Sequence, residues 1–189
     1  LNQADLVFEY YIGYQMNHFI AVYFGNKAQQ VGPLAPARMV DSRLTEHYQG
    51  ILAYASADNT VSNILAEVLP ERAFLRGFTP CPAMCNLTDV SGENTYVNTS
   101  ALQELYREQI SEPDEVDLSG LSFESYLSHW DADAQQLSLL YADFSVMQWD
   151  YDSESGKYQL SQDYAATDSS ISIQPSFDRV DGAPIAFDN

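Results

Sequence analysis

The carboxylate of Glu9 is the ionisable group with the most unusual surroundings in the sequence. It lies in the segment 7–11, VFEYY, where every neighbour is apolar or aromatic. A carboxylate in such a strand must find a partner or lie at a cleft open to solvent. Arg38, which follows the Gly32-Pro33 turn, is a credible partner. If the two side chains meet, they form either a buried structural ion pair or one wall of a polar binding cleft.

A polar loop from Ser56 to Thr60 extends this candidate site. It follows an apolar run and precedes a helical pattern, an arrangement that offers unpaired backbone N–H groups to a ligand in α/β proteins. In the simpler interpretation, Asp58 or Asn59 caps the helix and does nothing else. The complete set of candidate binding residues is Glu9, His18, Arg38, Ser56, Asp58, Asn59, Asn94 and Tyr96.

Common catalytic motifs are absent from the sequence. It has no G-x-S-x-G, no H-E-x-x-H and no glycine-rich phosphate loop, and its three histidines are far apart. We favour a binding or interaction module that needs no cofactor and no metal ion. The alternatives are a hydrolase that uses Glu9 or Asp58 as acid or base beside Arg38, and a scaffold completed by a partner strand. Apart from these possible roles, no catalytic residue of such a hydrolase can be assigned, so its catalytic residues are unknown.

Cys81 and Cys85 are the two cysteines of the chain. In an oxidising compartment, a disulfide across this tight loop would add about 2 kcal/mol of stability in the chain-entropy model. The other interpretations are two buried thiols and, less favoured, a metal site, since no CxxC motif or paired histidines supply further ligands. We expect the disulfide.

The charge balance is strongly acidic. The chain carries 27 Asp and Glu residues against 8 Lys and Arg residues, a formal net charge of -19 at pH 7. Such a surface repels phosphate backbones, so nucleic acid is not an expected ligand. No apolar run of about 18 residues is present, so we expect no transmembrane segment. Acidity and cysteine spacing together favour an extracytoplasmic protein.

The hydrophobic pattern predicts a mixed α/β (α+β) fold, with a mixed sheet flanked by helices and then a smaller β-rich region. Two largely buried strands are expected at Leu6–Ile12 and Phe19–Phe24, joined by a hairpin-like loop. A helix is expected after Pro36, with the apolar residues Met39, Val40 and Leu44 on one face.

Further elements follow along the chain. A strand is expected at 51–55, helices at 61–69 and 100–110, and a loop-rich stretch at 71–99. Segments 144–151 and 157–161 predict a β-hairpin, with later strands near Ile171 and at 185–187. We therefore divide the chain into a mixed α/β domain, 1–118, and a β-rich domain, 119–189.

The order of several short motifs resembles the YerB family of bacterial lipoprotein-like proteins of unknown function. The motifs are ADLVFE at 4–9, FIAVYF at 19–24, Gly32-Pro33 with Ala37-Arg38, Asn94 with Tyr96, WDYDSESGKY at 149–158 and DGAPIAFDN at 181–189. The resemblance implies an exported bacterial protein, either secreted or held at the envelope by a lipid anchor upstream. Its expected partner is an unidentified envelope ligand or protein.

The chain also departs from the family pattern. Three cations of that pattern are missing or replaced, with His18, Ala35-Pro36 and Leu160 at or near their places. If those arginines bind an anionic ligand, this chain has an altered site. The resemblance also implies a strand before Leu1 and another after Asn189, so a partner strand at the chain ends is a further expectation.

Overall fold

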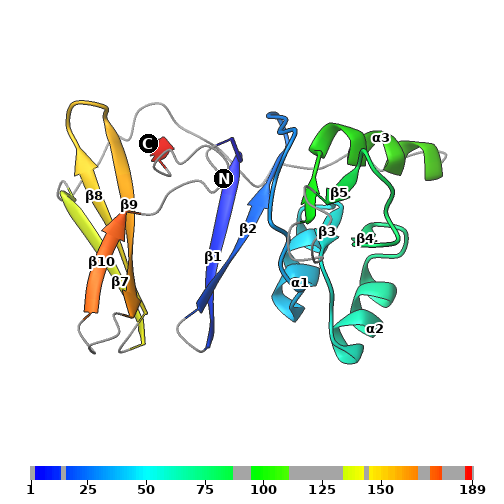
Figure 1. Ribbon diagram of the computed structural model, residues 1–189, viewed down its shortest axis with the longest axis horizontal. Helices are drawn as coiled ribbons and strands as arrows, with labels where there is room; N and C mark the ends of the chain where they lie inside the picture. Colours follow the sequence, from blue (N-terminus) through cyan, green and yellow to red (C-terminus); the bar gives the residue numbers. More distant parts are fainter. Residues whose placement is uncertain are drawn as a thin grey trace. The chain divides into compact units, whose positions relative to one another are not determined.

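The structure is a computed structural model of the 189-residue chain, and it describes residues 3–13, 16–86, 95–110, 134–142, 145–165, 171–175 and 186–188. These residues form a mixed α+β fold, which confirms the predicted class (Figure 1). The chain divides into two compact units. The hairpin unit comprises Leu1–Val22 with Glu124–Asn189, and the helical unit is Tyr23–Phe123. The predicted boundary at 118–119 falls outside the described residues, and the opening hairpin belongs with the C-terminal strands.

The hairpin unit begins with two antiparallel strands, β1 (Leu6–Gly13) and β2 (Met16–Val22). Their pairing confirms the predicted hairpin. The register shifts between Tyr11 and Gly13, and Gly13 has a φ of 90°, which glycine adopts at little cost. The side chains are partly exposed instead of largely buried as expected, since the described residues of β1 and β2 reach at most intermediate burial.

A five-stranded antiparallel sheet forms the rest of the hairpin unit. Its strands are β7 (Gln136–Ala142), β8 (Ser145–Asp152), β9 (Lys157–Ala165), β10 (Ile171–Pro175) and β11 (Ala186–Asp188). The order is β10-β9-β8-β7, with β11 pairing the start of β9. The predicted β8–β9 hairpin is present, and Met147 and Leu160 are each only 1% exposed at its centre.

The helical unit contains the described helices and two pairs of short strands. Its elements are α1 (Met39–His47), β3 (Leu52–Tyr54), α2 (Asn59–Val68), β4 (Ala73–Leu75), β5 (Met84–Asn86), β6 (Thr95–Val97) and α3 (Thr99–Gln109). β3 and β4 pair in parallel through the crossover helix α2, and β5 and β6 pair antiparallel. The short strands β4, β5 and β6 lie in the stretch expected to be loop-rich.

Two apolar clusters cover opposite faces of the β3–β4 pair. One cluster joins Tyr54 to Val61 and Leu65 of α2. The other joins Phe74 to Leu102 of α3 and to the β5–β6 pair. Successive strand residues point to opposite faces, so three-residue strands suffice to serve both clusters. The helical unit therefore has its own core.

The buried face of α1 is polar. Met39 and Val40 are exposed, whereas Asp41, Ser42 and Thr45 are buried where α1 packs on α2 and β3. These polar groups are satisfied locally: the Ser42 and Thr45 hydroxyls each donate to a backbone carbonyl of the same helix at 2.7 Å. Hydrogen-bonded hydroxyls can be buried at little cost, so hydrophobicity alone misplaces this face.

Across the ranges that the structure describes, no helix is both long enough and apolar enough to cross a membrane.

Candidate functional site

The predicted candidate residues are divided between the two units. Glu9 and His18 belong to the hairpin unit, and Arg38, Ser56, Asp58, Asn59 and Tyr96 belong to the helical unit. Asn94 lies outside the described residues. The proposed Glu9–Arg38 pair would join the two units, and it stays a prediction.

Glu9 is half-buried, and its described polar neighbours are the uncharged side chains of Asn17 and Tyr141. Its Oε1 accepts a hydrogen bond of 2.7 Å from Asn17 Nδ2 on β2. The hydroxyl of Tyr141 on β7 is a second polar neighbour of the carboxyl group. Oε2 is buried and has no hydrogen-bond partner in the described structure. Burial raises the pKa of Glu9 to about 7, although the hydrogen bonds from Asn17 and Tyr141 act in the opposite direction.

The face of the hairpin that carries Glu9 packs against β7. Strand alternation places Glu9 and Tyr11 on the same face of β1. The Tyr11 ring stacks on Tyr141, with centroids 6.2 Å apart and ring planes inclined by 14°. Burial and the Glu9 charge in turn raise the pKa of Tyr141. The carboxyl group therefore lies at a contact between two elements that are distant in the sequence.

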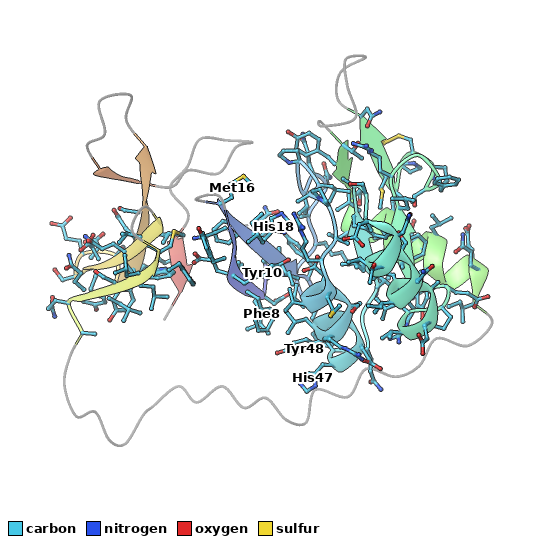
Figure 2. All side chains as sticks on the ribbon, turned by 90° about the horizontal axis from the view of Figure 1, so that it is seen from below. Phe8, Tyr10, Met16, His18, His47 and Tyr48 are labelled. Atoms are coloured by element: carbon cyan, nitrogen blue, oxygen red, sulfur yellow. A yellow bond between two sulfur atoms is a disulfide. The ribbon has the colours of Figure 1, made fainter. Side chains whose placement is uncertain are left out.

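His18 lies on the opposite face of the hairpin from Glu9. It is the register partner of Tyr10, and the Tyr10 hydroxyl is 3.2 Å from His18 Nδ1 (Figure 2). Their rings meet edge to face, with centroids 5.6 Å apart. Glu9 and His18 are consequently not parts of one site on this hairpin.

In the helical unit, three segments meet at the carboxyl ends of β3 and β4. The Ala37 N–H donates to the Ser56 carbonyl at 2.7 Å, which places the Arg38 segment beside the loop after β3. The Arg76 N–H donates to the Tyr54 carbonyl at 3.0 Å, which places the end of β4 beside the end of β3. The fold thus brings the predicted Arg38 and Ser56 segments together, and adds Arg76.

The acidic residues at this edge cap helices. The Asp58 carboxylate accepts from the Val61 N–H at 2.9 Å and is the N-cap of α2, as the simpler interpretation expects. Asp41 accepts from the Arg38 N–H at 2.7 Å at the start of α1. Asn59 is the exposed first residue of α2. The two carboxylates therefore already accept hydrogen bonds from backbone N–H groups that could otherwise bind a ligand at these helix ends.

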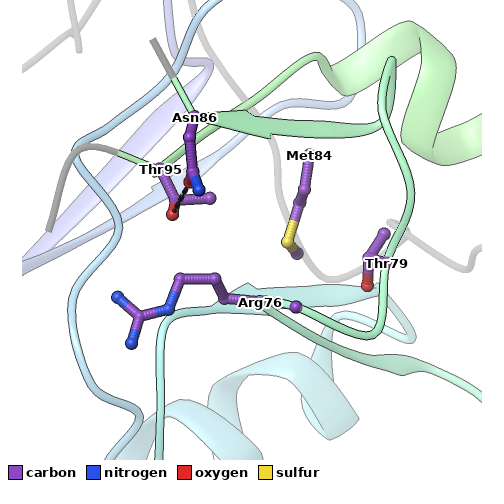
Figure 3. A pocket seen from close by; sticks show the side chains of 6 residues that line it. Arg76, Thr79, Met84, Asn86 and Thr95 are labelled. Atoms are coloured by element: carbon purple, nitrogen blue, oxygen red, sulfur yellow. Dashed lines mark hydrogen bonds between the residues drawn. The ribbon is translucent and has the colours of Figure 1, made fainter. Parts of the chain in front are cut away.

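A hollow of about 320 Å³ opens beside this edge (Figure 3). Thr95 and Thr79 are buried in its wall, with their hydroxyls donating to Asn86 Oδ1 at 2.6 Å and to the Leu75 carbonyl at 3.0 Å. Met84 contributes an apolar surface, and the Arg76 side chain extends along the opposite side. The lining residues are Arg76, Gly77, Thr79, Met84, Asn86 and Thr95.

None of these six lining residues belongs to the predicted candidate set. Arg76 follows the apolar triplet AFL at 73–75, which is too short to stand out as a strand. Asn86 and Thr95 become neighbours only when β5 pairs with β6. A strand assignment at 73–75 is the signal that would have placed Arg76 at the carboxyl end of a strand.

Cys81 and Cys85 form the predicted disulfide, with Cα atoms 5.0 Å apart. It closes the loop that leads from β4 into β5, between the lining residues Thr79 and Asn86. The Met84 N–H also donates to the Pro80 carbonyl within this loop. One disulfide and one backbone hydrogen bond therefore hold this wall of the hollow in place.

Segment 31–34 supports the opposite strand of the hollow. The Leu34 N–H donates to the Thr95 carbonyl at 2.9 Å, and Val31 bridges to Val97. Gly32 has a φ of 152°, and a Cβ there would lie 2.8 Å from the Thr95 oxygen and 2.9 Å from the Tyr96 ring. Only glycine fits this close approach, which gives the Gly32-Pro33 motif a structural reason. Tyr96 thus packs on the segment 31–34.

In the described part of the chain, no group of three or more His, Cys, Asp or Glu side chains is arranged to hold a metal ion.

Comparison with known proteins identifies the family. Residues 1–112 match the family described as "Protein of unknown function (DUF3048) N-terminal domain", and the chain belongs to this family. Its fold is similar to that in the crystal structure of YerB from Bacillus subtilis, with a TM-score of 0.71 and 16% sequence identity. The alignment covers 98% of this chain and 59% of YerB, so the chain spans about three fifths of that protein. No curated protein matches the chain. The resemblance to the YerB family is confirmed.

Proposed function

We propose that this chain is an extracytoplasmic binding module of a lipoprotein-like envelope protein, and that its ligand binds in the hollow of the helical unit. The observation that carries the proposal is a polar hollow at the carboxyl ends of two parallel strands, with one wall closed by a disulfide. In open α/β arrangements this end of the strands is where ligands bind.

The disulfide supports a location outside the cytoplasm. Structural disulfides persist in oxidising compartments and are rare where thiols are kept reduced. Here both cysteines of the chain are bonded to each other. Secretion, or a lipid anchor upstream of this chain, would bring the protein to such a compartment.

The lining of the hollow favours a small ligand with a planar anionic group. The Arg76 guanidinium is a planar fork of donors that matches a carboxylate at two points. The Asn86 amide and the Met84 side chain offer one further donor and an apolar contact. A volume of about 320 Å³ suits a small molecule or the end of a peptide.

The acidity of the whole protein constrains how such a ligand is recognised. With a net charge of -19, the protein repels anions at long range. Binding must therefore rely on short-range contacts in the hollow, where the guanidinium supplies the local positive charge. We expect weak affinity and a slow association rate for a small carboxylate.

The first test is retention of cell-wall peptides and glycans by the purified chain, with Arg76→Gln as the binding-site variant. Loss of the bidentate contact should weaken retention of carboxylate-bearing fragments at least tenfold, since charged hydrogen bonds contribute about 1.5–3 kcal/mol. Arg43→Gln is the matched control, because Arg43 pairs with Glu46 on the exposed face of α1 and does not line the hollow. Equal losses in both variants, or no retained fragment at all, would contradict the proposal.

Amide shift mapping by NMR sharpens this test. Titration with N-acetylated amino acids should shift the amide signals of Gly77, Asn86 and Thr95 and leave the hairpin unit unchanged. Arg76→Lys keeps the charge and loses the fork, so it should recover only part of the affinity. Shifts centred elsewhere would move the site away from the hollow.

The hydrolase alternative depends on an opening beside Glu9. The raised pKa of Glu9 suits a general acid, but the hollow belongs to the other unit, and none of its described lining residues carries a carboxylate. Binding is therefore the function that the hollow supports better. Completion of the sheet by a partner strand stays a prediction.

A further inference from the structure

Glu9 is placed where a change in its charge must alter the contact between two elements. Its carboxyl group lies between the β1–β2 hairpin and β7, with Asn17 on one side and Tyr141 on the other. Oε2 is buried and without a hydrogen-bond partner among the described residues. A charged oxygen in that position has lost water and gained nothing in return, so the ionised form is costly.

Among the described residues, no positively charged group contributes to the shifted pKa of the Glu9 carboxyl group. The groups that affect its ionisation are its own burial and the neutral side chains of Asn17 and Tyr141. The titratable groups that share its face are the phenols of Tyr11 and Tyr141, which stack on each other. His18 pairs with Tyr10 on the opposite face, and Asp5, before β1, is exposed.

We propose that Glu9 is a proton-binding site that controls how firmly the β1–β2 hairpin packs on β7. With a proton on Glu9, the buried carboxyl is neutral and the Tyr11–Tyr141 stack stays closed. Without the proton, the buried charge draws water toward the hairpin and loosens this contact. The device is independent of ligand binding in the hollow.

The direction of the pH effect follows from the ionisation of the group. The pKa of Glu9 rises from 4.5 to about 7 on folding, so the folded protein binds more protons between these values. The stability from this group is complete below about pH 4.5 and declines as the pH rises toward 7. Above pH 7 the effect levels off.

The direct test is an NMR titration of the whole chain with labelled glutamate side chains. The Glu9 carboxyl signal should titrate near pH 7, well above the ordinary range of a glutamate carboxyl group. Tyr141→Phe keeps the ring stack and removes the hydroxyl that favours the charged form. It should therefore raise the Glu9 midpoint further. An ordinary midpoint for Glu9, or a midpoint unmoved by Tyr141→Phe, would overturn the proposal.

Hydrogen exchange measures the consequence for packing. After correction for intrinsic exchange, protection of β1 and β2 amides should fall at least tenfold between pH 5 and pH 8, because opening of the hairpin would return the pKa of Glu9 from about 7 toward 4.5. Glu9→Gln, a neutral isostere, should abolish this fall, and Asp5→Asn should leave it unchanged. Amides of the helical unit provide the internal reference. A fall that persists in Glu9→Gln would refute the role of Glu9.

Discussion

The two units differ in how they accommodate polar groups. In the helical unit, the buried polar side chains that the structure describes have hydrogen-bond partners: Thr95 donates to Asn86, Thr79 to Leu75, and Ser42 to Met39. In the hairpin unit, Glu9 keeps one buried oxygen without a partner. The first arrangement favours a rigid wall around a hollow, and the second favours a contact that responds to pH.

The difference follows from the origin of the partners. In the helical unit they come from the same helix or from an adjacent short strand, so local folding secures them. Glu9 accepts a hydrogen bond from Asn17 on the paired strand β2, but its other polar neighbour, Tyr141, is 132 positions later in the sequence and reaches it from β7. A polar group that depends in part on a distant segment is a better candidate for regulation, because its environment can change without unfolding its own strand.

The largest expected effect tests whether the two units are stabilised separately. Leu65 is 1% exposed in the core of the helical unit. Leu65→Ala should destabilise that unit by about 2–5 kcal/mol, through lost burial and the cavity that remains. Urea denaturation followed by hydrogen exchange should locate the loss in residues 23–110. The Glu9 titration should stay unchanged.

Leu137→Ala is the matched control for this substitution. Leu137 is half exposed on β7 in the hairpin unit, so its truncation should change stability by less than about 1 kcal/mol. If Leu65→Ala instead lowers the stability of both units together, the two units are not stabilised separately.

A smaller effect is expected at Gly32, which connects backbone strain to the hollow. Gly32→Ala should destabilise the helical unit by about 1–3 kcal/mol, because the new Cβ collides with the Thr95 carbonyl in a conformation that favours glycine. Since Thr95 lines the hollow, ligand binding should weaken as well. Calorimetry and the amide titration measure the two effects.

Gly13→Ala is the control that distinguishes backbone strain from a steric clash of the new Cβ. Gly13 also has a positive φ, of 90°, but a Cβ there meets nothing within 4 Å. This variant should show only the cost of strain, about 1 kcal/mol, and should leave binding in the hollow intact. Equal effects on binding at both glycines would contradict the proposed support of Thr95 by segment 31–34.

The elements that could be predicted from the sequence were those with a strong local signal. The apolar runs of β1 and β2, the helix after Asp58, the β8–β9 hairpin and the cysteine pair all agree with the structure. The buried face of α1 could not be predicted from apolar residues, since Ser42 and Thr45 bury their hydroxyls against helix carbonyls. Hydrophobic periodicity does not record such hydrogen bonds.

The candidate site was predicted only in part, for a different reason. Arg38 and Ser56 belong to segments that meet, as local strand-loop-helix logic suggests. The sequence did not predict Arg76, Asn86 and Thr95 as site residues, because strands β4, β5 and β6 are each three residues long. Strands this short carry too few alternating residues for a pattern, and their pairing depends on tertiary contacts. Tyr141 was also not predicted as a neighbour of Glu9, because its strand β7 was not predicted.

The smallest expected effect distinguishes the two interpretations of Asp58. Its carboxylate accepts from the Val61 N–H, so Asp58→Ala should cost about 0.5–2 kcal/mol of helical-unit stability. Asp58→Asn keeps a capping oxygen and should cost little. If the residue only caps α2, both variants should bind carboxylate ligands as the native chain does, since Asp58 does not line the hollow. Tighter binding by both variants would instead show that its negative charge opposes the ligand, and would place the loop after β3 within the site.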